Sequence, residues 1–209
     1  ALCASLGTRL DAIGFHGQTV AHVPTPPSGY SSSTLQLGNP YACAKAFGCP
    51  VVFDFRRADM LTGGQGAPLV PAADSLMFHH RLNHGPIAIQ NIGGIGNVTY
   101  LSSGSPPIGF DTGPGNMVLD QVMFARTGIR FDDGGQVARS GQCDDTLLHK
   151  LLNHEFLDMV PPKSTGREQF GIDFTTELIT EFKLLQPEDI ICTFTHFAAQ
   201  SMAQAYRQF

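Results

Sequence analysis

The run GFDTGPGN at residues 109–116 has residue types and a spacing that could do chemistry. The apolar residues 107–110 predict the end of a buried strand, which delivers the carboxylate of Asp111 into a turn. Glycines at 113 and 115 let the backbone approach a ligand closely, because glycine has no Cβ atom. Asn116 can cap a following amphipathic helix, so the block predicts an anionic-ligand site beside a helix N-terminus. Taken alone, such a block is more typical of an Asx-turn that closes a strand.

Two further polar clusters follow predicted strands in the first third of the chain. The block HGQT at 16–19 comes after a short strand at 12–15, and its histidine is equally consistent with a structural role and with binding to sugar hydroxyl groups. The block RRAD at 56–59 follows a buried strand at 50–55 and by itself favours a surface ion cluster. The flexible GGQGAP loop directly after it favours charges that face a ligand.

Strands at 87–91 and 97–101, the first of them buried, flank the glycine-rich turn of the sequence NIGGIGN. Such a turn suits backbone amides that wrap a phosphate group. An ordinary hairpin is the alternative, but three glycines and two asparagines are more than a hairpin needs.

The block PPKSTGRE at 161–168 places a basic residue on each side of Ser-Thr-Gly. It predicts a rigid platform for anionic or hydroxylated groups. The acidic turn at 132–135 is most simply a solvated loop, with magnesium contact as a minor alternative. His80 and His84 are spaced for metal binding on a helix, but an exposed polar face is favoured because no third ligand is apparent.

Capping residues and apolar spacing predict several helices between these strands, so the chain is expected to be α/β. A helix end and turn are expected at residues 1–10, and the chain is expected to stop in mid-helix, which indicates a fragment of a longer protein. The predicted helices span 40–48, with Asn39 as N-cap, 70–84, 117–124, 144–154 and 173–185, and a last one starts at Pro187.

Composition narrows the functional class. Of 209 residues, 42% are hydrophobic and 15% charged, which allows a buried core. The net charge of −5 and the lack of a basic run argue against nucleic-acid binding. Five cysteines without a CxxC pattern indicate neither a disulfide framework nor a zinc site. With no membrane-spanning stretch and no signal-peptide pattern, we expect a cytoplasmic protein without a membrane partner.

Strand signals restart after a long helix near residues 83–86, so residues 1–84 and 85–209 are expected to belong to two different domains. No internal repeat, Walker A sequence, GxGxxG or GxSxG pattern is present.

Several blocks in this order resemble one family, the anhydro-N-acetylmuramic acid kinases and the related levoglucosan kinases. The matching blocks are FHGQTV (15–20), DFRRADM (54–60), GGQGAPLVP (63–71), NIGGIGNVT (91–99), GFDTGPGNMVLD (109–120) and PPKSTGRE (161–168). The resemblance implies the two-domain sugar-kinase/actin/Hsp70-like (ribonuclease H-like) architecture, here as parts of an N-terminal domain (1–84) and a C-terminal domain (85–209).

The resemblance also implies roles for particular residues. Asp111 matches the general base, which activates water to open a 1,6-anhydro sugar while O6 receives the γ-phosphoryl group of ATP with Mg²⁺. The resemblance assigns no metal ligands, and it leaves open whether the protein forms a homodimer. Residues expected to bind sugar are His16, Gln18, Arg56, Asp59, Gln65, Gly113 and Asn116, and those expected to bind nucleotide phosphate are Asn91, Gly93, Gly94 and Asn97.

Two missing segments and the choice between two substrates keep alternatives open. The GTSxDG phosphate hairpin and the CGGG-type segment near adenosine are absent from these 209 residues, so a non-catalytic sugar-binding fragment is one alternative. The sequence GGQGAP matches the anhydromuramic acid kinases, whereas levoglucosan kinases tend to have GRQGAP, so levoglucosan is the second substrate candidate. An actin/Hsp70-like ATPase that regulates a partner is a weaker alternative, because the HGQT and RRAD blocks are of the sugar-binding type.

Overall fold

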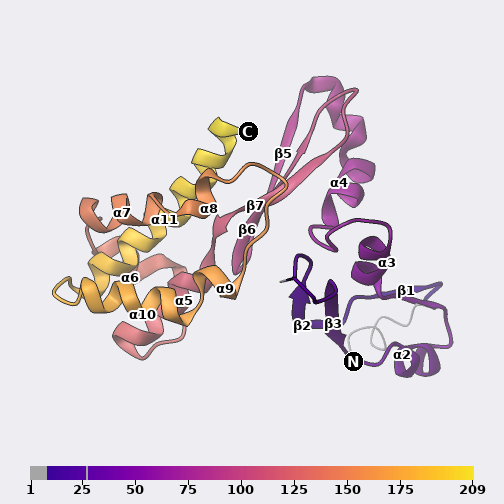
Figure 1. The fold of residues 1–209 in the computed structure, drawn as a ribbon, viewed down its shortest axis with the longest axis horizontal. Helices are drawn as coiled ribbons and strands as arrows, with labels where there is room; N and C mark the ends of the chain where they lie inside the picture. The colour runs from indigo at the N-terminus through magenta and orange to yellow at the C-terminus, as the bar shows by residue number, and fades with distance from the viewer. Residues whose placement is uncertain (1–8, 27) are drawn as a thin grey trace. The chain divides into compact units, whose positions relative to one another are not determined.

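The computed structural model describes residues 9–26 and 28–209, and nearly all of the helix end expected at residues 1–10 lies outside them. The described chain mixes helices and strands throughout (Figure 1), which confirms the α/β prediction. Two compact units can be distinguished, one ending at Leu69 and the other spanning Val70–Phe209. No helix in the described ranges is long and apolar enough to cross a membrane.

In its described residues, 9–26 and 28–69, the first unit has two small sheets and two helices. A parallel pair is formed by β1 (Ile13–Phe15) and β4 (Val51–Phe53), and an antiparallel pair by β2 (Gln18–Val23) and β3 (Ser33–Leu37). Helix α2 (Pro40–Phe47) begins where the sequence predicts, because the Asn39 side chain accepts a hydrogen bond of 3.1 Å from the backbone amide of Ala42. Its end at Gly48, in the left-handed conformation, is also confirmed.

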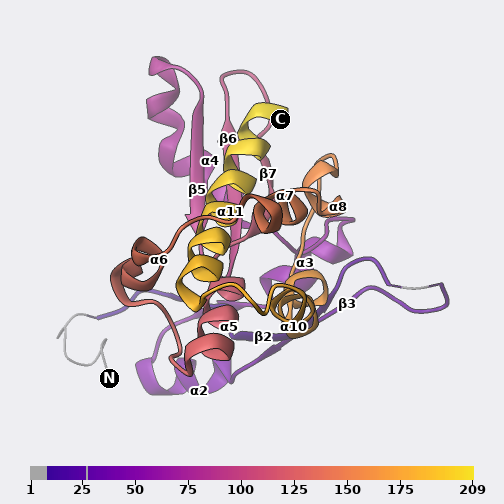
Figure 2. The same ribbon diagram turned by 90° about the vertical axis from the view of Figure 1, so that its left-hand side faces the viewer.

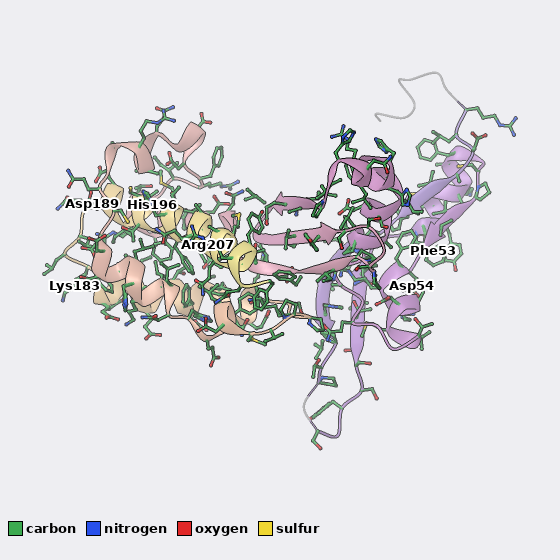
Figure 3. The ribbon with its side chains drawn as sticks, turned by 90° about the horizontal axis from the view of Figure 1, so that it is seen from above. Phe53, Asp54, Lys183, Asp189, His196 and Arg207 are labelled. Atoms are coloured by element: carbon green, nitrogen blue, oxygen red, sulfur yellow. The ribbon has the colours of Figure 1, made fainter. Side chains whose placement is uncertain are left out.

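The predicted buried strand at 50–55 is shorter and more exposed than expected. Val52 and Phe53 of β4 are 55% and 42% exposed, since β4 pairs with β1 alone in the described unit. Asp54 follows the strand with a positive φ of 64° and is the N-cap of helix α3 (Phe55–Leu61). Figure 3 labels Phe53 and Asp54 at this point of the chain. The charged side chains of the RRAD block therefore project from a helix.

The second unit is built on a three-stranded antiparallel sheet of β5 (Ile87–Ile92), β6 (Ile95–Leu101) and β7 (Ile108–Pro114), in that order. The predicted glycine hairpin joins β5 to β6. Strand β5 is half-buried to exposed rather than buried, because it is an edge strand of this sheet. Helices α4 (Val70–Phe78) and α11 (Pro187–Gln208) both contact β7 (Figures 1 and 2).

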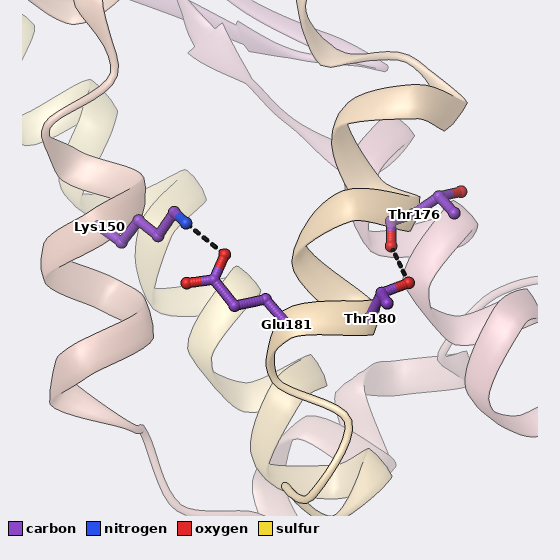
Figure 4. Close-up of polar contacts among 4 residues, drawn as sticks. All are labelled: Lys150, Thr176, Thr180 and Glu181. Carbon is purple, nitrogen blue, oxygen red and sulfur yellow. Dashed lines mark hydrogen bonds and ion pairs between the residues drawn. The ribbon is translucent and has the colours of Figure 1, made fainter.

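The hydrophobic core of this unit lies among its helices. Four phenylalanines have no exposed surface, and Ile190, Phe194 and Phe197 form a buried stripe on α11. An ion pair between Lys150 and Glu181 joins α7 to α10 at the surface (Figure 4). The remaining helices are α5 (Asn116–Thr127), α6 (Gln136–Ser140), α7 (Asp145–Leu152), α8 (Glu155–Asp158), α9 (Arg167–Phe170) and α10 (Ile172–Glu181).

Three helix predictions need correction. The segment predicted as one helix at 70–84 is α4 followed by the 3₁₀ helix η1 (His79–His84), where residues three apart share a face, so His80 and His84 do not. Helix α5 continues to Thr127, three residues beyond the predicted end at Phe124. Helix α10 ends at Glu181, four residues earlier than predicted.

The acidic turn is not a simple solvated loop. The carboxylate of Asp132 accepts hydrogen bonds of 2.9 Å from the amides of Val137 and Ala138, at the start of α6. It therefore satisfies amides that have no partner within the helix. Within the described ranges, no group of three or more His, Cys, Asp or Glu residues is placed to hold a metal ion.

Candidate active site

Asp111 lies inside strand β7 rather than in a turn after it. The strand continues through Thr112 and Gly113 to Pro114, so the sequence prediction of a turn at Asp111 is wrong. The backbone amide of Asp111 donates to the carbonyl of Lys163 at 3.0 Å, and its Oδ2 accepts from the amide of Thr165 at 2.9 Å. The PPKSTGRE block thus lies against β7 and orients the half-buried carboxylate.

Strand register brings Asp111 beside two of the predicted phosphate-binding residues. Asn97 on β6 pairs with Asn91 on β5 and with Asp111 on β7. Residues directly opposite each other on antiparallel strands share a face, so two amide side chains and the carboxylate form a row across the sheet. The register shifts beside Asn97 and leaves Thr112 without a direct partner. Such irregularities redirect side chains and are over-represented next to active sites.

The N-terminus of α5 is not available to an anionic ligand in the way predicted. The amide of Asn116 donates to the carbonyl of Gly93 at 2.8 Å, and those of Gly115 and Met117 donate to Gly94 at 2.9 and 3.2 Å. The hairpin between β5 and β6 therefore occupies the amides that would bind an anion. Asn116 is the first residue of the helix, Gly115 holds the N-cap position, and no side chain caps it. The predicted Asn116 cap is wrong.

Glycine is required at position 115 by this contact. A Cβ atom there would lie 2.4 Å from the carbonyl oxygen of Gly93. The second glycine of the DTGPGN block thus serves the approach of backbone to backbone, between the hairpin and α5.

A cavity of about 900 Å³ adjoins this contact. It brings Gly93, Gly94 and Asn116 together with Arg167 of the predicted basic platform and with Asp120, which had no predicted site role. Burial raises the pKa of the Asp120 carboxyl. Asp120 follows Asn116 by four residues on α5, a spacing that places both on one helix face and could have identified it. Neither Asp111 nor the two asparagines in its row line this cavity.

The basic platform predicted at 161–168 is only partly present. Lys163 is buried, and its ammonium donates to the backbone carbonyls of Phe156 and Leu157 at 3.2 and 2.9 Å. Burial lowers its pKa. Lys163 therefore faces the interior, and Arg167 is the basic residue of the block that lines the cavity.

In the first unit, predicted sugar-binding residues from distant positions meet in one cluster. Arg56 donates from Nε to His16 Nε2 at 2.9 Å and from Nη1 to the carbonyl of Gly66 at 2.7 Å. The carboxylate of Asp59 accepts from the amide of Gly66 at 2.7 Å. The structure thus joins the HGQT, RRAD and GGQGAP blocks through hydrogen bonds.

Other predicted residues lie at the surface or serve packing. Gln18 and Gln65 are exposed, and the Gln18 amide donates weakly to the carbonyl of Thr19 at 3.4 Å. Gly113, with φ of 130°, lies against α11, where a Cβ atom would be 3.0 Å from Ser201 Oγ. Its lack of a side chain is therefore explained by helix packing.

Comparison with known proteins identifies the family. The family model for anhydro-N-acetylmuramic acid kinase matches residues 3–209. Two relatives named anhydro-N-acetylmuramic acid kinase, from Bacillus cereus strains ATCC 10987 and ATCC 14579, are 44% and 46% identical over 204 residues. The alignments cover 96% of this chain but 53% and 52% of those relatives, so the chain spans about half the length of the curated relatives it matches. The chain belongs to the anhydro-N-acetylmuramic acid kinase family.

Proposed function

We propose that the protein is an ATP-dependent kinase that opens the 1,6-anhydro ring of anhydro-N-acetylmuramic acid with water and phosphorylates O6. The observation that carries this proposal is the carboxylate of Asp111, which belongs to the DTGPGN block on strand β7 of a chain in a kinase family and accepts a hydrogen bond from the amide of Thr165. The product would be N-acetylmuramic acid 6-phosphate.

In the proposed step, Asp111 takes a proton from a water molecule whose oxygen attacks the anomeric carbon. The bond between C1 and O6 breaks, and O6 forms a bond to the γ-phosphorus of ATP as ADP leaves. A carboxylate fixed by a backbone donor suits a general base, because it can both accept the proton of the water molecule and hold that molecule in the orientation for attack on the anomeric carbon. Water, sugar and ATP are all consumed, so the step requires no further reactant.

The nucleotide phosphates are proposed to lie along the glycine hairpin, near Asn91, Gly93, Gly94 and Asn97. The adjoining cavity offers Arg167, whose guanidinium matches phosphate geometry. Magnesium is proposed to enter with ATP. It is commonly held by one or two carboxylates together with phosphate oxygens and water, so it does not need a cluster made wholly of protein side chains. Bound there, it would neutralise charge on the transferred phosphoryl group.

The sugar is proposed to contact the cluster in the first unit, and also Gly113 and Asn116. Arg56 and Asp59 tie the GGQGAP loop to α3, so the loop is fixed before a ligand arrives. His16 is oriented by Arg56, while Gln18 and Gln65 are exposed and accessible to a ligand. Such preorganised hydrogen-bonding groups suit a substrate rich in hydroxyl and amide groups.

At the scale of the intact protein, we propose the two-domain ribonuclease H-like architecture, with residues 1–84 and 85–209 contributing to its two domains. We also propose a cytoplasmic enzyme that acts on a small sugar and binds neither nucleic acid nor membrane, with homodimerisation as a further proposal. The family and the sequence composition support these statements.

Levoglucosan is the second substrate candidate, and the GGQGAP loop supports anhydro-N-acetylmuramic acid over it. A Cβ atom at Gly64 would lie 2.0 Å from the Asp59 carboxylate, so the arginine of the GRQGAP pattern would require the Asp59 side chain to move away from the Gly66 amide that it holds. A sugar-binding protein without kinase activity is the candidate from a different functional class.

An isotope experiment tests the proposed reaction. The intact protein is incubated with ATP, Mg²⁺ and either anhydrosugar in H₂¹⁸O, and the products are analysed by mass spectrometry. We expect a 6-phosphate that carries one ¹⁸O at C1, with anhydro-N-acetylmuramic acid as the preferred substrate. Phosphorylation without ¹⁸O would refute ring opening by water, and binding without product would favour the non-catalytic candidate.

A further inference from the structure

A buried lysine lies beside the Asp111 strand and takes no part in the chemistry proposed above. The Lys163 side chain is 3% exposed, and its ammonium donates to the carbonyls of Phe156 and Leu157. The ring centroids of Phe110, Phe156 and Phe209 lie 5.9, 4.8 and 5.1 Å from Nζ. A buried charge is costly unless it is fully paired, so this ammonium must be held by these specific partners.

The two carbonyls belong to the one-turn helix α8. Carbonyl groups at a helix C-terminus often lack a partner within the helix. The Phe156 carbonyl accepts from the amide of Met159 at 3.2 Å, and both Phe156 and Leu157 are buried. Lys163 supplies a donor for the Leu157 carbonyl and a second donor for that of Phe156, and the nearby carboxylate of Asp158 favours the charged form of the amine. The Lys163 side chain therefore links the 161–165 segment to α8.

The backbone of the same segment reaches Asp111. The carbonyl of Lys163 accepts from the amide of Asp111 at 3.0 Å, and two residues further on the amide of Thr165 donates to Asp111 Oδ2 at 2.9 Å. The side chain of Thr165 is in turn held by Gln169 at 2.5 Å. One short piece of chain is thus anchored to α8 by an ammonium and to β7 by its backbone, and it presents a donor to the carboxylate.

We infer that Lys163 is a positioning residue for the proposed general base. Its ammonium fixes the 161–165 segment along β7, and this keeps the Thr165 amide on Oδ2 so that the carboxylate points at the attacking water. The inference rests on the proposed function, because it assumes that Asp111 acts as the base. A methionine at 163 would fill similar space but remove the donor to the buried Leu157 carbonyl, and the segment would shift relative to β7.

The test is steady-state kinetics on the intact protein with anhydro-N-acetylmuramic acid and ATP. For Lys163→Met we expect kcat to fall at least about tenfold, equivalent to about 1.4 kcal/mol of barrier, with both KM values within about twofold of the parent. Lys163→Gln keeps a donor and should recover part of kcat. Lys150→Met removes a lysine from a surface ion pair and should leave kcat unchanged.

Unchanged kcat in Lys163→Met would overturn the inference, and so would a loss shared between kcat and both KM values. Should the methionine variant fail to fold, Lys163→Gln carries the same test with a smaller expected loss of kcat. Asp111→Asn is measured in parallel. Near-normal turnover in that variant would refute the proposed function itself, whereas an inactive Asp111→Asn beside a fully active Lys163→Met would refute the role of Lys163 alone.

Discussion

His154 and Lys163 serve the two ends of helix α8. His154 Nδ1 accepts from the amide of Phe156 at 3.2 Å at the start of the helix, and Lys163 donates to carbonyls at its end. Burial lowers the pKa of His154, whose ring packs on Phe170 with centroids 4.6 Å apart. An Nδ1 that accepts a hydrogen bond must be unprotonated, so the cap and the lowered pKa require the same neutral form.

This arrangement predicts a pH dependence of stability. Because the pKa of His154 in the folded protein lies below its unfolded value of about 6.5, the unfolded state binds the proton first as pH falls. The free energy of unfolding should therefore decrease as pH is lowered through about 6.5 towards the folded pKa, with its full value retained above that range.

Urea unfolding of the parent and of His154→Asn at several pH values between 5 and 8 would measure it. Asparagine keeps an acceptor at the N-cap but does not titrate, so the variant should lose less stability on acidification than the parent. If the free energy of unfolding fell by the same amount with pH in the two proteins, the role assigned to His154 would be contradicted.

At the scale of elements, features set by local sequence were predictable and features set by distant contacts were not. The cap at Asn39, the glycine end of α2 and the proline start of α11 depend on neighbouring residues, and all three are confirmed. The start of α5 is decided by carbonyls about twenty residues away, at Gly93 and Gly94. No local pattern could show that these carbonyls would occupy its amides.

In the candidate site, too, local features were predictable and features set by distant contacts were not. The sequence located the DTGPGN and NIGGIGN blocks, but the register that puts Asn91, Asn97 and Asp111 in one row comes from pairing of three strands. The burial of Lys163 also escaped prediction, because lysines are rarely buried and its partners on α8 are defined by the tertiary fold.

The contact between the hairpin and α5 predicts unequal effects of two glycine substitutions. In Gly115→Ala the new methyl group would meet the Gly93 carbonyl at 2.4 Å, whereas in Gly93→Ala the nearest atom would be at an ordinary 3.6 Å. Overpacking of a well-packed contact costs about 1–3 kcal/mol. Thermal unfolding should therefore show a lower Tm for Gly115→Ala than for Gly93→Ala. Equal Tm values would show that the contact can relax without cost.

At the scale of the whole molecule, the proposed function requires residues from both compact units. The cluster around Arg56 belongs to the first unit, and Asp111 and the glycine hairpin belong to the second. The intact protein should therefore show separable effects, with sugar affinity sensitive to the first cluster and turnover sensitive to the second.

Two neighbouring arginines test this division. Arg56 holds His16 and Gly66, whereas Arg57 pairs with Asp54 at 3.2 Å and is largely exposed. Hydrogen bonds that involve a charged group contribute about 1.5–3 kcal/mol, so Arg56→Ala should raise the KM for the sugar about 10- to 100-fold and leave the KM for ATP unchanged. Arg57→Ala removes the same charge and should change neither. Equal effects of both variants on the sugar KM would show that charge alone matters.

The most direct test of the central claim is the activity of Asp111→Asn in the intact protein. Asparagine preserves the shape of the side chain but cannot take a proton from water, and a general base contributes typically about 10²–10⁴-fold to a rate. We predict a loss of phosphorylation of that order, with the dissociation constant for anhydro-N-acetylmuramic acid, measured by calorimetry, within a few-fold of the parent value. Near-normal turnover in Asp111→Asn would contradict the account.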